Sequence, residues 1–126
     1  MFSEMIQNLL NSGGKAAAMK RAAQINAYTA RANNTQNIIR NNGGTADNYN
    51  QLGMLYVRAG MYKEATEVYQ RSAALGSVMA MNNLGNIAQL QKNFIEAKKW
   101  YEKALSVDPN NAGARKNLER VMGEIE

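Results

Sequence analysis

Apolar residues recur at three- and four-residue spacing through much of residues 46–126, and this spacing is typical of amphipathic helices. Tyr49, Leu52, Gly53 and Tyr56 fall on one face of a first helix, which we expect Gly60 to end. The face of a second helix follows, and its members are Tyr62, Ala65, Val68, Tyr69 and Ala73. The pattern therefore predicts a hairpin of two helices.

The chain repeats this pattern at an offset of 32 residues. Residues 51–54 superpose on residues 83–86, and residues 60–65 superpose on residues 92–97. The shared positions hold, in order, Leu-Gly, an aromatic residue, Glu-Ala and a second aromatic residue. A fixed period of this length is the signature of stacked helical hairpins.

Small residues stand at the same places in both units. Gly53 and Gly85 lie within a helix, where glycine costs roughly 1 kcal/mol relative to alanine, so we expect them to permit a close approach of the paired helix. We expect Ala65 and Ala97 where the next helix crosses, because a larger side chain would overpack that contact. Aromatic residues are expected to fill the gaps between helices, namely Tyr62, Tyr69, Phe94 and Tyr101.

This order of Leu-Gly, aromatic, alanine, aromatic and proline resembles the tetratricopeptide family, over roughly Ala46 to Glu126. The segment Ala104–Asn111, with its Pro109, is especially typical of the end of such a unit. Residues 73–77 hold no proline, and this junction resembles the related Sel-one-like repeats. We expect repeats at about residues 46–77 and 78–111, with a tight junction that changes the superhelical pitch between them.

A further helix is predicted over residues 112–126, where Leu118, Val121, Met122 and Ile125 supply an apolar stripe. Each unit of a solenoid buries surface only against its neighbours, so the last one needs a polar cap. The predicted fold is therefore all-α: an α-solenoid of two such hairpins plus a C-terminal capping helix, preceded by additional N-terminal helices.

Residues 1–45 match the repeat poorly and form a separate N-terminal helical segment in this interpretation. We predict a short helix that Ser3 caps and that ends near Gly13, then a helix from Lys15 to about Ala32. Asn33-Asn34 weakens its continuation, and Gly43-Gly44 indicates a linker. Three arrangements are open: a degenerate hairpin packed on residues 49–59, a docking arm for a second copy, or a flexible arm.

Composition argues against catalysis. The chain has no cysteine and no histidine, which removes thiolate chemistry, the commonest general base and the commonest metal ligand. No pair of carboxylates stands out, and Gly13-Gly14-Lys15 lacks the spacing of a phosphate loop. We therefore expect no enzyme activity, no cofactor and no metal.

The net charge of +5 lies mostly in the first third, where five basic residues face Glu4 alone. Basic groups this sparse are typical of a solvated face, so nucleic acid is not the expected partner. No run of residues is long and apolar enough to span a membrane. Residues 1–10 lack a basic flank before an apolar run, so we expect no secretory signal and a cytoplasmic location.

The family resemblance implies that the first helices of the units line a concave groove for an extended peptide or a partner helix. Asparagine suits this task because its amide both donates and accepts, and Lys116 and Arg120 lie one turn apart, where they can meet a carboxylate. In the competing interpretation, the asparagines solvate a helix face or bond to a neighbouring helix. The candidate groove residues are Asn50, Met54, Val57, Met79, Asn82, Asn83, Asn86, Gln89, Lys116 and Arg120.

Some members of the family bind the C-terminal carboxylate of chaperones through lysine, asparagine and arginine at set positions. Asn83 matches one of these positions, but Met54 stands in the first unit and Gly113 and Asn117 stand in the last. We therefore do not expect that clamp. The leading hypothesis is an adaptor that holds a protein or peptide partner in the groove. The alternative is a self-assembly module in which the N-terminal arm makes a homo-oligomer.

Overall fold

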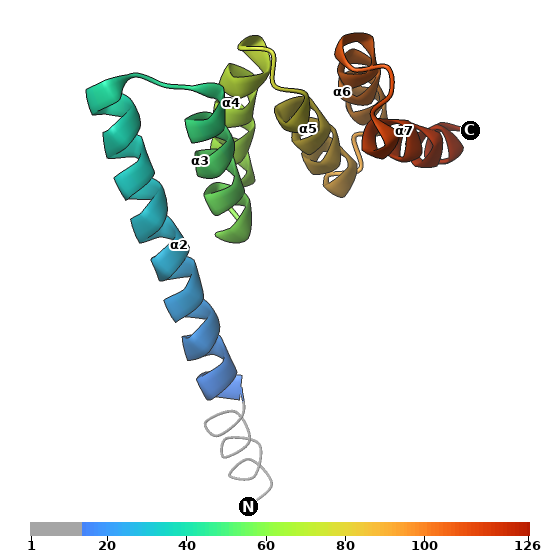
Figure 1. Cartoon of the computed structure of the whole chain (residues 1–126). Helices are drawn as coiled ribbons and strands as arrows, with labels where there is room; N and C mark the ends of the chain where they lie inside the picture. The colour runs from blue at the N-terminus through green and yellow to red at the C-terminus, as the bar shows by residue number, and fades with distance from the viewer. Residues whose placement is uncertain (1–13) are drawn as a thin grey trace, which may run out of the picture.

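A computed structural model describes residues 14–126, and within that range the regular structure is six α-helices (Figure 1). The short helix predicted after Ser3 lies outside the described residues. The all-α prediction is confirmed. The helices are α2 (Lys15–Asn42), α3 (Ala46–Arg58), α4 (Tyr62–Ala74), α5 (Val78–Leu90), α6 (Phe94–Val107) and α7 (Ala112–Ile125).

The helices stack in chain order, as a solenoid requires. Each packs mainly on the helices next to it in the sequence, and α5 makes an additional, smaller contact with α7. The helices α3 and α4 form one hairpin, and α5 and α6 form the next, with α7 lying against the second (Figure 1). Residues Ala46 and Val78, where α3 and α5 begin, stand 32 positions apart, as do Tyr62 and Phe94, where α4 and α6 begin. The sequence repeat is thus a structural repeat.

Polar side chains begin four of the helices. Each accepts a hydrogen bond from the backbone N–H three residues further on, which satisfies one of the amides that an N-terminus leaves free. The pairs, with their donor–acceptor distances, are Thr45 with Asn48 (3.1 Å), Ser77 with Ala80 (3.1 Å), Asn93 with Glu96 (3.4 Å) and Asn111 with Ala114 (2.8 Å).

Three of the turns between helices share one geometry. After α3, the N–H of Gly60 donates to Val57 O (2.9 Å) and that of Met61 donates to Tyr56 O (2.8 Å), which is the Schellman pattern. The same pattern ends α4 at Gly76 and α5 at Lys92. The left-handed residue has φ of 76° at Gly60, 95° at Gly76 and 59° at Lys92. Within residues 14–126, Lys92 is the one non-glycine residue with positive φ.

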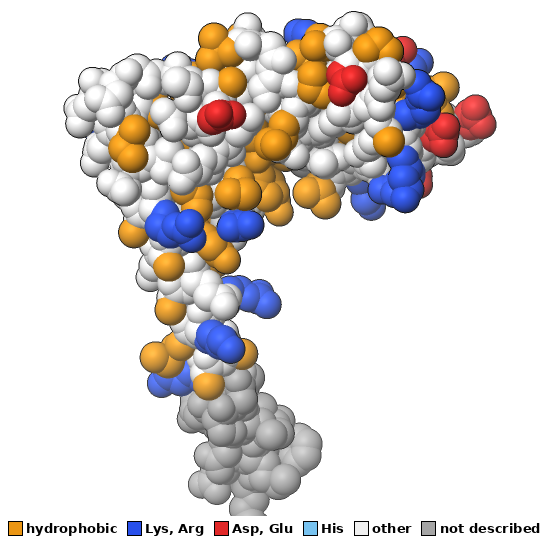
Figure 2. Space-filling view, in the orientation of Figure 1, with side chains coloured by type: hydrophobic (Ala, Val, Ile, Leu, Met, Phe, Trp, Pro, Cys, Tyr) orange, Lys and Arg blue, Asp and Glu red, His pale blue; other side chains and the backbone are white. Residues whose placement is uncertain are grey.

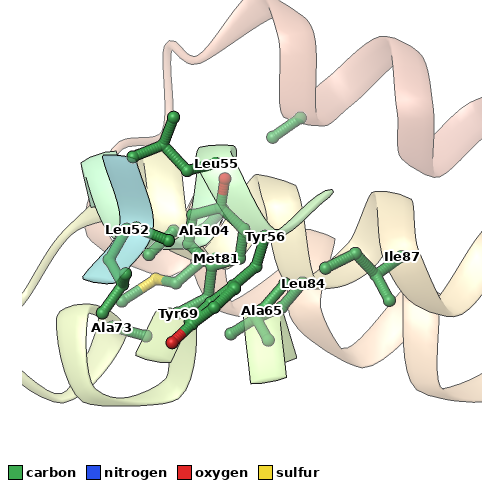
Figure 3. Close-up of a cluster of buried hydrophobic side chains, with 13 residues drawn as sticks. Leu52, Leu55, Tyr56, Ala65, Tyr69, Ala73, Met81, Leu84, Ile87 and Ala104 are labelled. Atoms are coloured by element: carbon green, nitrogen blue, oxygen red, sulfur yellow. The ribbon is translucent and has the colours of Figure 1, made fainter. Parts of the chain in front are cut away.

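The core is formed by buried side chains from all six described helices and is built largely of leucine, alanine and tyrosine (Figure 3). Ala65 and Ala97 have no exposed surface, and Tyr69 and Tyr101 are buried, as the repeat predicted. Tyr62 is less buried than Tyr69 and Tyr101: it lies at the start of α4 and is 37% exposed.

Helix α2 differs from the prediction, since it runs through Asn33-Asn34 to Asn42 without a break. Its second half packs on α3, where Ala32 and Thr35 are buried. The hydroxyl of Thr35 donates to Arg31 O (3.1 Å) and so is satisfied within the helix. Burial against a neighbour outweighs the weak helix propensity of asparagine. The second half of α2 is therefore packed in cis, whereas residues 14–24 are exposed throughout.

Candidate binding groove

The exposed face shared by α3 and α5 encloses a groove of about 390 Å³. Its floor and walls are mainly apolar, with amide side chains and one cation at the edges. Figure 2 shows hydrophobic side chains gathered along the lower side of the helix array, with Lys and Arg side chains on either side of them. The lining residues are Asn50, Gln51, Met54, Val57, Arg58, Tyr69, Met79, Asn83, Asn86, Ile87 and Leu90.

Helical periodicity explains this lining. In α5, Met79, Asn83, Asn86 and Leu90 follow each other at intervals of four, three and four residues, so they project from one face. The opposite face of α5 is buried in the core. The structure therefore brings together six of the candidate residues, which are Asn50, Met54, Val57, Met79, Asn83 and Asn86.

A second, wider hollow of about 620 Å³ continues the groove toward α7. Both hollows share Asn86 and Leu90, and the second also contains the candidates Gln89 and Arg120. Two further charged residues, Lys92 and Glu124, line it. The groove thus extends from the first hairpin to the last helix.

Lys116 does not join this surface. It lies with Ala112 and Glu119 on a separate shallow hollow of α7. Asn117 is the residue that reaches α5, where its Nδ2 donates to Asn86 Oδ1 (3.4 Å). Lys116 and Arg120 point only about 40° apart around α7, but Arg120 lies one turn further along the helix, where it lines the second hollow.

Two of the candidate asparagines are used inside the fold. Asn50 donates to Ser77 Oγ (3.0 Å) and accepts from Ser72 Oγ (2.8 Å), so it ties α3 to α4 and to the start of α5. Asn82 donates to Asn111 Oδ1 (3.3 Å) and lines none of these hollows. Both follow the competing interpretation, in which asparagines bond to a neighbouring helix.

Asn86 combines both roles. Its Oδ1 accepts the proton of the Tyr101 hydroxyl (2.6 Å), and Gln89 Oε1 lies 3.1 Å from the same hydroxyl as a second, longer acceptor. Burial raises the pKa of Tyr101 to about 12, although the charge of Arg120 opposes the shift. The phenol therefore stays protonated and remains a donor at neutral pH. Asn86 itself is exposed, with its amide held in place on the groove edge.

Tyr69 forms part of the groove wall from below. Burial raises its pKa, while the nearby amide of Asn83 and the charge of Arg58 act in the opposite direction. Asn83 thus stands over a buried phenol, next to the apolar side chains of the groove. Within residues 14–126, no cluster of three or more potential metal-ligating side chains occurs, and no helix is long and apolar enough to cross a membrane.

Sequence reasoning left five lining residues out of the candidates: Gln51, Tyr69, Ile87, Arg58 and Leu90. Two of them, Arg58 and Leu90, are exposed on the outward face of the first helices. A usable signal was present, because Arg58 lies four residues after Met54 and Leu90 lies four after Asn86. The 32-residue repeat also places them at equivalent positions. Extending the outward face by one turn would have found both.

Two family models described as tetratricopeptide repeat match the chain, one over residues 46–75 and the other over residues 78–111. Together they cover just over half of the sequence. The matches coincide with the α3–α4 and α5–α6 hairpins, and α2 lies outside both.

Two relatives carry the description uncharacterized protein ycf37. The protein from Pyropia yezoensis is 34% identical over 82 residues, which cover 64% of this chain and 46% of the relative. The protein from Porphyra purpurea is 34% identical over 65 residues, which cover 50% of this chain and 38% of the relative. The chain therefore matches less than half the length of either relative.

Solved structures share the fold. The Arabidopsis OM64 TPR domain aligns with a TM-score of 0.67 at 19% identity and covers 86% of this chain and 97% of its own. The second TPR domain of the human RPAP3 protein, solved in complex with the HSP70 peptide SGPTIEEVD, aligns with a TM-score of 0.68 at 20% identity. That alignment covers 87% of this chain and 98% of the RPAP3 domain.

Proposed function

The chain belongs to the tetratricopeptide-repeat family, and from that premise we propose that it is a non-catalytic adaptor that holds a peptide or helix of a partner protein in the groove between α3 and α5. Members of this family serve as protein-interaction modules. The groove offers what such a partner needs: an apolar floor with a few polar groups at its edge.

The exposure of the apolar side chains carries this proposal. Met54 is 39% exposed, Met79 is 63% exposed and Leu90 is 67% exposed, and all three line the same groove. Single exposed apolar residues are ordinary on protein surfaces, but a contiguous set within a hollow is typical of an interaction site. Covering these side chains with a partner removes apolar area from water and favours the complex.

The polar rim supports binding of a polypeptide in particular. Asn83 and Asn86 stand on the groove edge, and an amide can pair with either the N–H or the C=O of a peptide backbone. Gln89 and Arg120 extend that rim toward α7. In the RPAP3 domain, a fold of the same kind is occupied by a peptide. We assign partner contact to Met54, Met79, Asn83, Asn86, Gln89 and Arg120, and a bracing role to Asn50 and Asn82.

A selection from a displayed peptide library tests the site. We expect the full chain to enrich defined sequences, and we expect Met79→Glu to lose them because it places a charge on the apolar floor. The matched control is Ile95→Glu, which changes an exposed aliphatic residue of α6 outside the groove. Equal enrichment by Met79→Glu and the unaltered chain would refute the assignment.

A second function is self-assembly through residues 1–45. It is favoured by residues 14–24, all of which are exposed in the described part of the chain. In this proposal residues 46–126 form the repeat domain and the N-terminal segment adds to it. The mass of the full chain should be followed across a dilution series, beside a variant that lacks residues 1–44. A dimer lost on truncation supports assembly, whereas a monomer at all concentrations rules it out.

A further inference from the structure

The groove extends beyond the two matched repeats onto α2. A hollow of about 280 Å³ at the junction of α2 and α3 shares Val57 and Arg58 with the groove. Arg21, Ile25 and Tyr28 of α2 line its other side. The exposed surface therefore runs from α2 across α3 and α5 to α7, so a partner that fills it contacts the helix that precedes the repeats.

Charge along this surface is unevenly distributed. The centre, around Met54 and Met79, has apolar and amide side chains only. The end at α2 has Arg21 and Arg58, and no described acidic residue lines either the groove or the hollow at that end. The cations at the α7 end are Lys92 and Arg120, beside the single carboxylate of Glu124.

From this distribution we propose a partner of defined chemistry: an internal segment of another protein, with aliphatic or methionine side chains at its centre and Asp or Glu on both flanks. This inference rests on the proposed function of the same groove. The apolar floor of the groove fits an apolar centre in the partner segment. The cations at the two ends of the surface fit acidic residues on the two flanks of that segment. A terminal carboxylate is not required, because the cations stand at opposite ends and do not converge on one point.

The side chain of Arg58 is positioned for contact with an acidic residue of the partner. Its guanidinium carbon lies 5.9 Å from the centre of the Tyr28 ring, a cation–π distance. Stacking on an aromatic face restrains the guanidinium and leaves its N–H edges free to meet a carboxylate. Exposed ion pairs are weak, so we expect each flank to change the dissociation constant by no more than about fivefold.

The test begins with a random peptide library fused through its C-terminus, so that no terminal carboxylate is free, selected on the full chain at low salt. We expect recovered sequences with a Leu-, Ile- or Met-rich centre and acidic residues on both sides. Recovered sequences that depend on Met79 yet carry no acidic flanks would overturn this inference and leave the proposed function standing. Recovery of no sequence that depends on Met79 would overturn both.

A recovered peptide, labelled with a fluorophore, is then titrated with variants of the full chain. We expect Arg58→Gln and Arg120→Gln each to weaken binding by roughly threefold to fivefold at low salt, with the loss shrinking as salt rises. Arg58→Lys should restore part of the affinity, which separates charge from folding. Arg71→Gln, on an exposed position of α4 outside these hollows, is the matched control. Equal affinities for all four variants would overturn the inference.

Discussion

Gly53 lies so close to the ring of Tyr69 that a Cβ atom on the glycine would stand 2.6 Å from the ring carbons Cε1 and Cζ. The second hairpin repeats the contact, with Gly85 and Tyr101 at 2.5 Å from Cε1. Real Cβ atoms essentially never come this close. In each hairpin, therefore, the backbone of the first helix packs directly against a tyrosine ring of the second helix. Tyr69 and Tyr101 in turn support Asn83 and Asn86 at the groove edge.

This contact makes Gly85→Ala destabilising, although alanine is the better helix former. The gain in propensity is about 1 kcal/mol, while overpacking of a tight contact costs about 1–3 kcal/mol. The ring of Tyr101 would have to shift and its hydrogen bonds to Asn86 and Gln89 would weaken. Urea denaturation followed by helical circular dichroism measures the net loss.

The matched control is Gly123→Ala in α7, where a Cβ would meet nothing within 4 Å. Only the propensity gain remains there, so we expect a stabilisation of up to about 1 kcal/mol. The two variants should differ in sign. Stabilisation by Gly85→Ala would mean that the Tyr101 ring can move aside at little cost in free energy, and it would contradict the prediction.

Lys92 occupies a left-handed position that its counterpart in the first unit, Gly60, fills without strain. A side chain at positive φ costs roughly 1–2 kcal/mol, so we expect Lys92→Gly to stabilise the chain by about 1 kcal/mol. Gly60→Ala should have the opposite effect, since it places a Cβ at φ of 76°. Thermal unfolding of the two variants gives the comparison, and an unchanged midpoint for both would contradict it.

Alkaline pH should weaken the fold through Tyr101. Burial raises the pKa of this phenol from its ordinary value of 10.0 to about 12 in the folded chain. The stabilisation linked to this raised pKa is complete below pH 10 and is lost as the pH rises toward 12. Burial also raises the pKa values of Tyr56 and Tyr69, so they contribute to the same loss.

The variant Tyr101→Phe isolates the contribution of that residue. Without an ionisable group, its free energy of unfolding should fall less than that of the unaltered chain between pH 10 and pH 12. Its absorbance titration should also lack the last tyrosine to ionise. Parallel pH profiles for the two proteins would show that Tyr101 ionises as an ordinary phenol.

The docking of α2 depends on Ala32, which has no exposed surface against α3. We expect Ala32→Glu to release the second half of α2, because the contact has no room or partner for a buried carboxylate. Amide hydrogen exchange should then rise around Ile39, which packs on the same core. The matched control is Ala23→Glu on the exposed half of α2, and an equal rise in that variant would argue against docking through Ala32.

Hairpins, repeat and capping follow from the sequence because they depend on local chemistry. The 32-residue offset, the outward face of each helix and the role of Gly53 and Gly85 are all set by residue spacing and size. Pairs such as Ser77 and Ala80 cap a helix start within three residues. No distant contact is needed to predict them.

Which of the candidate residues line the groove depends on the tertiary structure. Asn50 and Asn82 have the same chemistry as Asn83, but cross-helix hydrogen bonds to Ser77 and Asn111 give them bracing contacts within the fold. Asn86 also bonds to neighbouring helices, yet its side chain stays exposed on the groove edge. The placement of α7 brings Arg120 to the groove, whereas Lys116, one turn earlier in the helix, lines a separate hollow.

The length of α2 also depends on the tertiary structure. Its local sequence favours a weak point at Asn33-Asn34, yet burial of Ala32 and Thr35 against α3 carries the helix to Asn42. Spacing alone determined which residues share a face. What each face meets depends on how the helices pack, and the packing of α2 on α3 places Arg21 and Tyr28 in a hollow next to the groove.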